Sequence, residues 1–152
     1  MSARGVNIHA TAIVAGTTGL IFLGPSGSGK SALAFDCLSE ARLHGQFAAL
    51  VADDQVFISR FDTQVVGARP KTIKGLIELR HGGIAQVESI PRAVLHYAVL
   101  PVDRATSERL PERGMQATLL DDVRLPAIHV PTDVRLPFSF INALISAWAV
   151  PR

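Results

Sequence analysis

One short stretch constrains what this chain can fold into more than any other, the glycine-rich run Gly24-Pro25-Ser26-Gly27-Ser28-Gly29-Lys30-Ser31. Glycines permit positive φ angles and let backbone N–H groups approach an anion closely. Lys30 would place a positive charge beside the β- and γ-phosphates of a nucleotide, and the Ser31 hydroxyl can coordinate magnesium. The pattern therefore predicts a P-loop for a nucleotide such as ATP with Mg²⁺. The alternative is a Gly/Ser-rich loop of no function.

The sequence on either side of this loop fits the same prediction. Apolar runs at residues 12–15 and 20–23, separated by a Thr-Thr-Gly turn, predict paired strands that lead into the loop. Residues 31–43 have helical spacing, and His44-Gly45 ends the predicted helix. A strand followed by a loop and a helix N-terminus is the context that a P-loop requires.

The acidic pair Asp53-Asp54 is the second candidate. It directly follows the continuous apolar run of residues 47–52, which predicts a strand buried on both faces. An acid at the end of a buried strand beside a P-loop usually serves the metal, and a pair offers one carboxylate for the metal and one for proton transfer. The alternative is a solvated turn with capping aspartates.

Glu78 and His9 are weaker candidates when each is taken alone. Glu78 lies in an alternating apolar stretch and could equally be a surface residue paired with Lys74 or Arg80. A lone histidine near a terminus, such as His9, is usually a polar surface residue. The histidines do not have the spacing of a zinc site, so zinc is not expected.

The rest of the chain is rich in predicted short strands. We expect strands at residues 56–60, 63–66, 77–80, 96–102 and 127–130. Turns are expected at Phe61-Asp62 and Gly82-Gly83, and residues 104–113 are expected to form a polar loop. The apolar stretch 138–150 predicts a buried terminal helix and is too short to span a membrane. The result is one strand-rich α/β domain over residues 1–152 with two helices.

Charge and cysteine content narrow the classes of partner. The net charge is +2, and the basic residues are scattered without interleaved aromatic residues, so neither a nucleic-acid nor a membrane partner is expected. Cys37 is the single cysteine, which excludes an intramolecular disulfide and fits the reducing cytoplasm. Its place in the predicted helix favours a packed thiol over a reactive one.

Four features together resemble the catalytic domain of HPr kinase/phosphorylase, the bacterial family that phosphorylates a serine of the phosphocarrier HPr. In that family a histidine precedes the P-loop by the interval that separates His9 from Gly24. The family's Val-Ala-Asp-Asp strand end is present at residues 51–54. A family stretch similar to I-x-G-x-x-E-I-R-G-x-G-I corresponds to residues 73–84. The histidine, the paired aspartates and the Glu-Leu-Arg strand are much more specific than a P-loop alone.

The resemblance implies a fold and a set of residue roles. The fold would be a P-loop kinase-like α/β domain of the HPr kinase/phosphoenolpyruvate carboxykinase type. The family's catalytic residues would correspond to Asp53, His9, Lys30 and Arg80. Its magnesium shell would correspond to Ser31, Asp54 and Glu78. In this assignment Asp53 takes the proton from the substrate serine and acts as the acid in the reverse reaction, and Arg80 helps to orient the site.

The function implied is that of a Mg-ATP-dependent serine kinase for an HPr-like phosphocarrier of a phosphotransferase system, with phosphorolytic removal of the phosphate as a second reaction. Members of the family form hexamers. This chain lacks a counterpart of the N-terminal domain of longer members, and residues 130–137 differ from the family segment Pro-Val-Arg-Pro-Gly-Arg-Asn. The difference at residues 130–137 leaves the second reaction open, and the hexamer is carried over only weakly. Two other hypotheses are an ATP-sensing regulatory module without transfer activity and a small-molecule P-loop kinase or carboxykinase relative.

Overall fold

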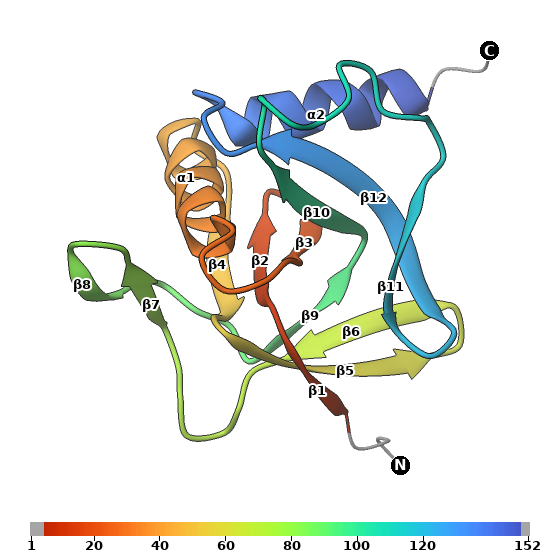
Figure 1. Ribbon diagram of the computed structural model, residues 1–152. Coiled ribbons are helices and arrows are strands. Elements are labelled where there is room, and N and C mark those ends of the chain that lie inside the picture. Colours follow the sequence, from red (N-terminus) through yellow and green to blue (C-terminus); the bar gives the residue numbers. More distant parts are fainter. Residues whose placement is uncertain (1–4, 150–152) are drawn as a thin grey trace.

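The elements of this chain form three layers, as a computed structural model of residues 5–149 shows (Figure 1). One layer holds the helices α1 (Lys30–Leu43) and α2 (Pro137–Trp148). A six-stranded sheet forms the middle layer and a four-stranded sheet forms the third. The six-stranded sheet is buried on both faces, because its side chains contribute to two separate hydrophobic clusters.

The six-stranded sheet carries the P-loop. Its strands lie in the order β11-β12-β10-β3-β2-β4. Their bounds are β2 (Thr11–Ala15), β3 (Thr18–Phe22), β4 (Ala48–Ala52), β10 (Tyr97–Val102), β11 (Gln116–Leu120) and β12 (Val123–Pro131). Strand β10 pairs in parallel with both β3 and β12, while the other pairs are antiparallel. The P-loop follows β3, so it lies at the carboxyl ends of the parallel strands, where open α/β sheets bind their ligands.

Alternation along β3 explains why this strand is apolar at successive positions. Leu20 and Phe22 belong to the hydrophobic cluster that includes α1 residues, whereas Ile21 belongs to the cluster shared with the four-stranded sheet. Successive side chains of a strand point to opposite faces, so a strand covered on both sides needs apolar residues throughout. The sheet that positions the loop is thus held by packing on both of its faces.

The remaining strands form two antiparallel sheets. The four-stranded sheet has the order β1-β5-β6-β9, with bounds β1 (Val6–His9), β5 (Gln55–Phe61), β6 (Gln64–Ala68) and β9 (Arg92–Leu95). A separate hairpin, β7 (Leu76–Leu79) with β8 (Gly83–Gln86), extends away from the body on the side of α1 (Figure 1). This hairpin forms one wall of the site described below.

Helix α2 corrects one prediction, because most of it is not buried. Only Pro137, Phe138 and Ile141 are buried, so the helix lies on the surface with one face against the core. Its N-terminus is held by Glu40 of α1, which is 5% exposed and accepts hydrogen bonds from the backbone N–H groups of Phe138 at 2.9 Å and Ser139 at 2.8 Å. The predicted end of the helix at residue 150 lies outside the described residues. Within residues 5–149, no helix has the length and apolar character to cross a membrane.

Most of the predicted elements are present, and the strand-rich α/β fold is confirmed. The strand predicted at residues 47–52 is present as β4 (Ala48–Ala52) and is buried throughout although it lies at the sheet edge, whereas Phe47 precedes the strand and is exposed. The segment that follows β8 covers this edge, since Leu50 N–H donates to Glu88 O and Ile90 N–H donates to Leu50 O.

Cys37 is buried, as expected. Four strands were missed: β1, β8, β9 and β11. Each has only four or five residues and at least one exposed position, which is too short for a clear apolar pattern.

Candidate functional site

The P-loop takes a conformation in which its three glycines, Gly24, Gly27 and Gly29, all have positive φ angles. Gly24 has a φ of 146°, and a methyl group on it would lie 2.7 Å from Ser28 Oγ. Gly27 has a φ of 82°, and a methyl group there would lie 3.5 Å from Arg80 Nη1. Positive φ angles are costly for residues with a Cβ atom. The loop therefore has the backbone curvature that lets N–H groups face an anion.

Lys30 is folded back onto the loop that precedes it. The residue is 6% exposed, and its Nζ donates to the carbonyl oxygens of Gly24 at 2.7 Å and Pro25 at 3.0 Å. Burial lowers the pKa of Lys30, while the nearby carboxylates of Asp54 and Asp53 act in the opposite direction. The ammonium group is thus held at the loop by contacts that phosphate oxygens can replace.

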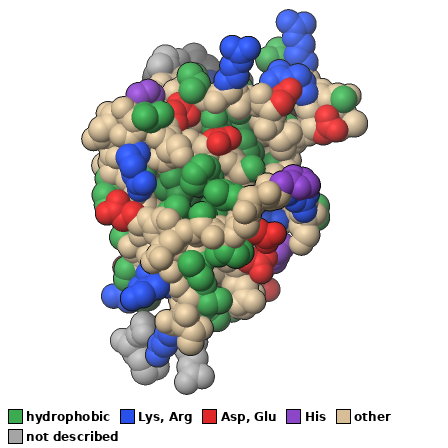
Figure 2. All heavy atoms as spheres, turned by 90° about the vertical axis from the view of Figure 1, so that its left-hand side faces the viewer, with side chains coloured by type: hydrophobic (Ala, Val, Ile, Leu, Met, Phe, Trp, Pro, Cys, Tyr) green, Lys and Arg blue, Asp and Glu red, His purple; other side chains and the backbone are tan. Residues whose placement is uncertain are grey.

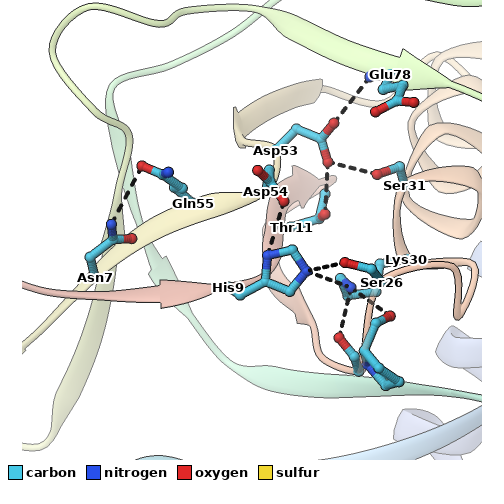
Figure 3. Close-up of polar contacts among 12 residues, drawn as sticks. Asn7, His9, Thr11, Ser26, Lys30, Ser31, Asp53, Asp54, Gln55 and Glu78 are labelled. Atoms are coloured by element: carbon cyan, nitrogen blue, oxygen red, sulfur yellow. Dashed lines mark hydrogen bonds and ion pairs between the residues drawn. The ribbon is translucent and has the colours of Figure 1, made fainter.

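The two adjacent aspartates point to different partners. Asp54 has a φ of 75°, in the left-handed region that residues other than glycine rarely adopt. This turn directs the Asp53 carboxylate toward α1 and the Asp54 carboxylate toward His9 (Figure 3). Residues in such conformations cluster at functional sites, where the surrounding structure maintains them.

Asp53 accepts three hydrogen bonds. Its Oδ1 receives the hydroxyl protons of Thr11 at 2.8 Å and Ser31 at 2.7 Å, and its Oδ2 receives the Glu78 backbone N–H at 3.0 Å (Figure 3). An ionised carboxylate has about four lone-pair positions, so one position on Oδ2 remains for a further ligand. The carboxylate is therefore fixed in orientation and still able to bind.

His9 bridges the second aspartate and the P-loop. Its Nδ1 lies 2.9 Å from Asp54 Oδ1, and its Nε2 lies 3.3 Å from Lys30 Nζ and 3.4 Å from Ser26 Oγ. Because an ammonium group only donates, this network places the acceptor at Nε2 and the proton at Nδ1. The imidazole thus donates to Asp54 and fixes the direction of its carboxylate.

These side chains share one open cavity of about 680 Å³. It is lined by every residue that the sequence singled out except Gly24 and Pro25, whose carbonyl groups face Lys30. Glu78 of β7 and Arg80, in the turn that follows β7, line it from the side of the hairpin. Figure 2 views the molecule from the side of α1 and this hairpin, and hydrophobic side chains come to the surface in the middle of that face.

The residues present fit a magnesium ion that is shared with a nucleotide. Ser31 Oγ and the Asp53 carboxylate supply adjacent oxygen donors at one edge of the cavity. Magnesium prefers oxygen ligands and usually takes one or two carboxylates together with substrate phosphates and water. Within residues 5–149, no group of three or more His, Cys, Asp or Glu could hold a metal unaided, so the phosphates would have to complete the shell.

Sequence reasoning missed several residues of this cavity. Thr11, Leu76, Ile84 and Thr132 all line it. Thr11 sits in a strand that reads as apolar, and its hydroxyl gives no signal until Asp53 is placed beside it. Thr132 follows β12, and its methyl group would lie 3.0 Å from a Cβ on Gly29. Its position after a parallel strand, separated from the P-loop strand β3 only by β10, was the available clue.

Comparison with known proteins places this geometry in context. The family model described as "HPr Serine kinase C-terminal domain" matches residues 2–93, more than half of the chain. A curated HPr kinase/phosphorylase of Mycoplasmopsis pulmonis is 24% identical over 140 residues, which cover 85% of this chain and 43% of that protein. Another, from Lactobacillus johnsonii, is 34% identical over 85 residues, covering 55% of this chain and 25% of that protein. The chain thus spans less than half the length of these relatives.

A solved structure shows the same fold. It is described as the Hpr(Ser) kinase/phosphatase from Coxiella burnetii, and it superimposes with a TM-score of 0.74 at 20% identity. The match covers 95% of this chain and 90% of that one. The predicted fold type is therefore confirmed over nearly all of the chain, including the part beyond residue 93.

Proposed function

This chain belongs to the family of HPr serine kinase C-terminal domains, and we propose that it is a Mg-ATP-dependent protein serine kinase that acts on an HPr-like phosphocarrier. One observation carries the proposal: a P-loop, a histidine and two separately held carboxylates meet in one open cavity. The names of the related proteins support the choice of acceptor. Transfer to a protein serine needs an open site of this kind, because the acceptor hydroxyl must reach the γ-phosphate.

Binding of the nucleotide would use the loop and its lysine. The Lys30 ammonium would exchange the carbonyl oxygens of Gly24 and Pro25 for phosphate oxygens. Ser31 and Asp53 would hold Mg²⁺, which neutralises charge on the phosphates when it is bound. Arg80 lies close to Gly27 of the loop and would add a second positive charge near the phosphates. A loose phosphoryl transition state needs this positioning and charge more than it needs covalent help.

The geometry favours Asp54, rather than Asp53, as the proton acceptor. Asp53 already accepts three hydrogen bonds, one of them from the P-loop serine that would bind the metal. Asp54 is exposed to the cavity and contacts only His9 among the side-chain interactions described for it. His9 Nδ1–H would keep one Asp54 oxygen in place while the other receives the serine proton. This exchanges the roles that the sequence resemblance gave to the two aspartates.

The test is transfer of labelled γ-phosphate from Mg·ATP to a purified HPr-like protein, with nucleotide binding measured in parallel by calorimetry. We expect Asp54→Asn to lower transfer by about 100- to 10,000-fold, the usual contribution of a general base, while it keeps Mg-dependent nucleotide binding. Asp53→Asn should lose the Mg²⁺ dependence of binding itself. If the two variants behave in the opposite way, Asp53 is the base. Tight nucleotide binding without transfer by the wild type would favour an ATP-sensing module.

Phosphorolysis can be tested in the same preparation. The reverse reaction would use the same atoms, with inorganic phosphate attacking the phosphoserine and Asp54 returning the proton to the serine oxygen. Addition of inorganic phosphate and Mg²⁺ to the phosphorylated acceptor should release pyrophosphate if this activity is present. An acceptor that keeps its phosphate under these conditions would restrict the protein to the forward reaction.

A further inference from the structure

The junction between β1 and β2 touches both aspartates of the site. Three consecutive residues make one contact each: His9 Nδ1 lies 2.9 Å from Asp54 Oδ1, Ala10 N–H donates to Asp54 O at 3.2 Å, and Thr11 Oγ1 donates to Asp53 Oδ1 at 2.8 Å. The roles of His9 and Asp54 are part of the proposed function. The contact made by Thr11 is not explained by it.

Thr11 carries a polar hydroxyl group at a position where an apolar side chain would be expected. The residue is fully buried, and it opens a strand that continues with Ala12, Ile13, Val14 and Ala15. Valine has nearly the same shape and would avoid the cost of burying a polar group. In the register of β2 with β3, Thr11 pairs with Phe22, at the end of the strand that enters the P-loop. The hydroxyl is therefore attached to the same rigid sheet as the loop.

The other two donors to Asp53 belong to residues that are less buried than Thr11. Ser31 is half-buried at the start of α1 and would itself bind the metal. Glu78 is exposed and belongs to the hairpin that extends from the body. Of the three, only Thr11 is fully buried, and the proposed function gives it no part in binding the metal or the nucleotide. Its donation to Oδ1 also leaves the open position of the carboxylate on Oδ2 (Figure 3).

We propose that Thr11 is a positioning residue, whose buried hydroxyl holds the Asp53 carboxylate in the orientation that serves Mg·nucleotide binding. Asp53 in this orientation receives the Ser31 proton, so the lone pairs of the serine oxygen face the cavity. Without Thr11 the carboxylate rotates and this alignment of Ser31 is lost. The inference rests on the proposed function, because it assumes that Ser31 and Asp53 serve a magnesium ion.

Three variants separate positioning from packing. Thr11→Val removes the hydroxyl and keeps the shape, and Thr11→Ser restores a hydroxyl in a smaller side chain. Ile13→Val is the matched control, since it trims a fully buried side chain of the same strand without touching the site. Two readouts are used. One is the affinity for ADP by calorimetry across a series of Mg²⁺ concentrations, and the other is hydrogen exchange of the Glu78 amide in the ligand-free protein.

Thr11→Val should raise the Mg²⁺ concentration needed for half-maximal enhancement of ADP affinity by roughly 10- to 100-fold, the usual effect of losing a partner that orients a metal ligand. ADP affinity without Mg²⁺ should stay unchanged. The Glu78 amide should lose protection, because its acceptor Asp53 Oδ2 moves. Thr11→Ser should restore most of both properties, and Ile13→Val should affect neither.

Two results would overturn the inference, and only one of them would also overturn the proposed kinase function. A Thr11→Val protein with wild-type Mg²⁺ dependence and wild-type Glu78 protection would assign the hydroxyl to packing alone and leave the proposed kinase function standing. A wild-type protein whose ADP affinity does not respond to Mg²⁺ would overturn both this inference and the proposed function.

Discussion

Within residues 5–149, the carboxylates of Asp53 and Glu40 accept three hydrogen bonds each, and they lie in different regions. Asp53, at the P-loop cavity, receives the hydroxyl groups of Thr11 and Ser31 and one backbone N–H. Glu40, at the junction of α1 and α2, receives the backbone N–H groups of Phe138 and Ser139 and the Ser139 hydroxyl. The number of donors therefore does not separate the two residues.

What separates them is access. Glu40 is 5% exposed, and its charge compensates the N–H groups at the start of a helix, so it serves stability. Asp53 borders an open cavity together with a lysine and a histidine, so it can meet a ligand. A carboxylate that accepts three hydrogen bonds thus indicates a structural role where it is enclosed and a binding role where it faces a cavity.

The largest effect is expected for Asp53→Asn. Transfer should fall by about 1,000-fold, because positioning and charge neutralisation carry most of phosphoryl transfer. The free energy of unfolding of the ligand-free protein should change by less than about 1 kcal/mol, since an amide can keep most of the hydrogen bonds. Labelled transfer and urea unfolding measure the two quantities. A large loss of stability would give Asp53 the same role as Glu40. Asp122→Asn, at an exposed ion pair with Arg60, is the control and should change neither.

Glu40→Ala should show the opposite pattern. It leaves three donors at the start of α2 without their acceptor, so the unfolding free energy should fall by about 2–4 kcal/mol. The folded protein should keep wild-type nucleotide affinity, measured by calorimetry at a temperature where unfolding is negligible. Glu88→Ala, at an exposed ion pair with Arg42, should cost less than about 1 kcal/mol. Lost affinity in folded Glu40→Ala would mean that the two regions are coupled through α1.

Gly27→Ala and Gly45→Ala compare two glycines with similar positive φ angles, of which only Gly27 lines the cavity. Gly27 has a φ of 82°, and Gly45, after α1, has a φ of 73° with open space around it. Both alanine variants should lose about 1–2 kcal/mol of stability, the cost of a left-handed residue with a Cβ. Only Gly27→Ala should also bind nucleotide more weakly, by about tenfold, because its methyl group enters the space between the loop and Arg80. Equal affinities in the two variants would contradict a phosphate-binding role for this part of the loop.

The smallest effect concerns the charge of Lys30. Burial lowers its pKa in the folded protein, so the unfolded chain binds more protons over the range between the lowered pKa and the usual value of 10.5. Stability of the wild type should therefore rise with pH in that range. Lys30→Met should be more stable than the wild type near neutral pH, and the difference should shrink as pH approaches 10.5. Unfolding curves across alkaline pH measure it. Lys71→Met, at an exposed lysine, should show no such trend, and the same absence in Lys30→Met would contradict the prediction.

Local patterns made much of the fold predictable. The apolar residues of β2, β3 and β4 stand next to one another because these strands are covered on both faces. The short strands β1 and β9 could not be predicted, because they pair with the distant segments β5 and β6. Strands β8 and β11 pair with their neighbours in the sequence, but each has only four or five residues with few buried positions. The surface position of α2 was missed for a related reason. Its sequence is apolar nearly throughout, and only the tertiary structure decides which face meets the core.

For the site, the sequence by itself determined which chemistry is available. The P-loop pattern, the aspartate pair and the positions of His9, Glu78 and Arg80 are local signals, and all of these residues except Gly24 and Pro25 line one cavity. The tertiary structure decided which partners each of these side chains contacts. The left-handed turn at Asp54 sends adjacent carboxylates to different partners, and Thr11 meets Asp53 across 42 residues of sequence. Contacts between distant segments depend on strand register and on a single backbone angle, and no local pattern of residue types encodes either.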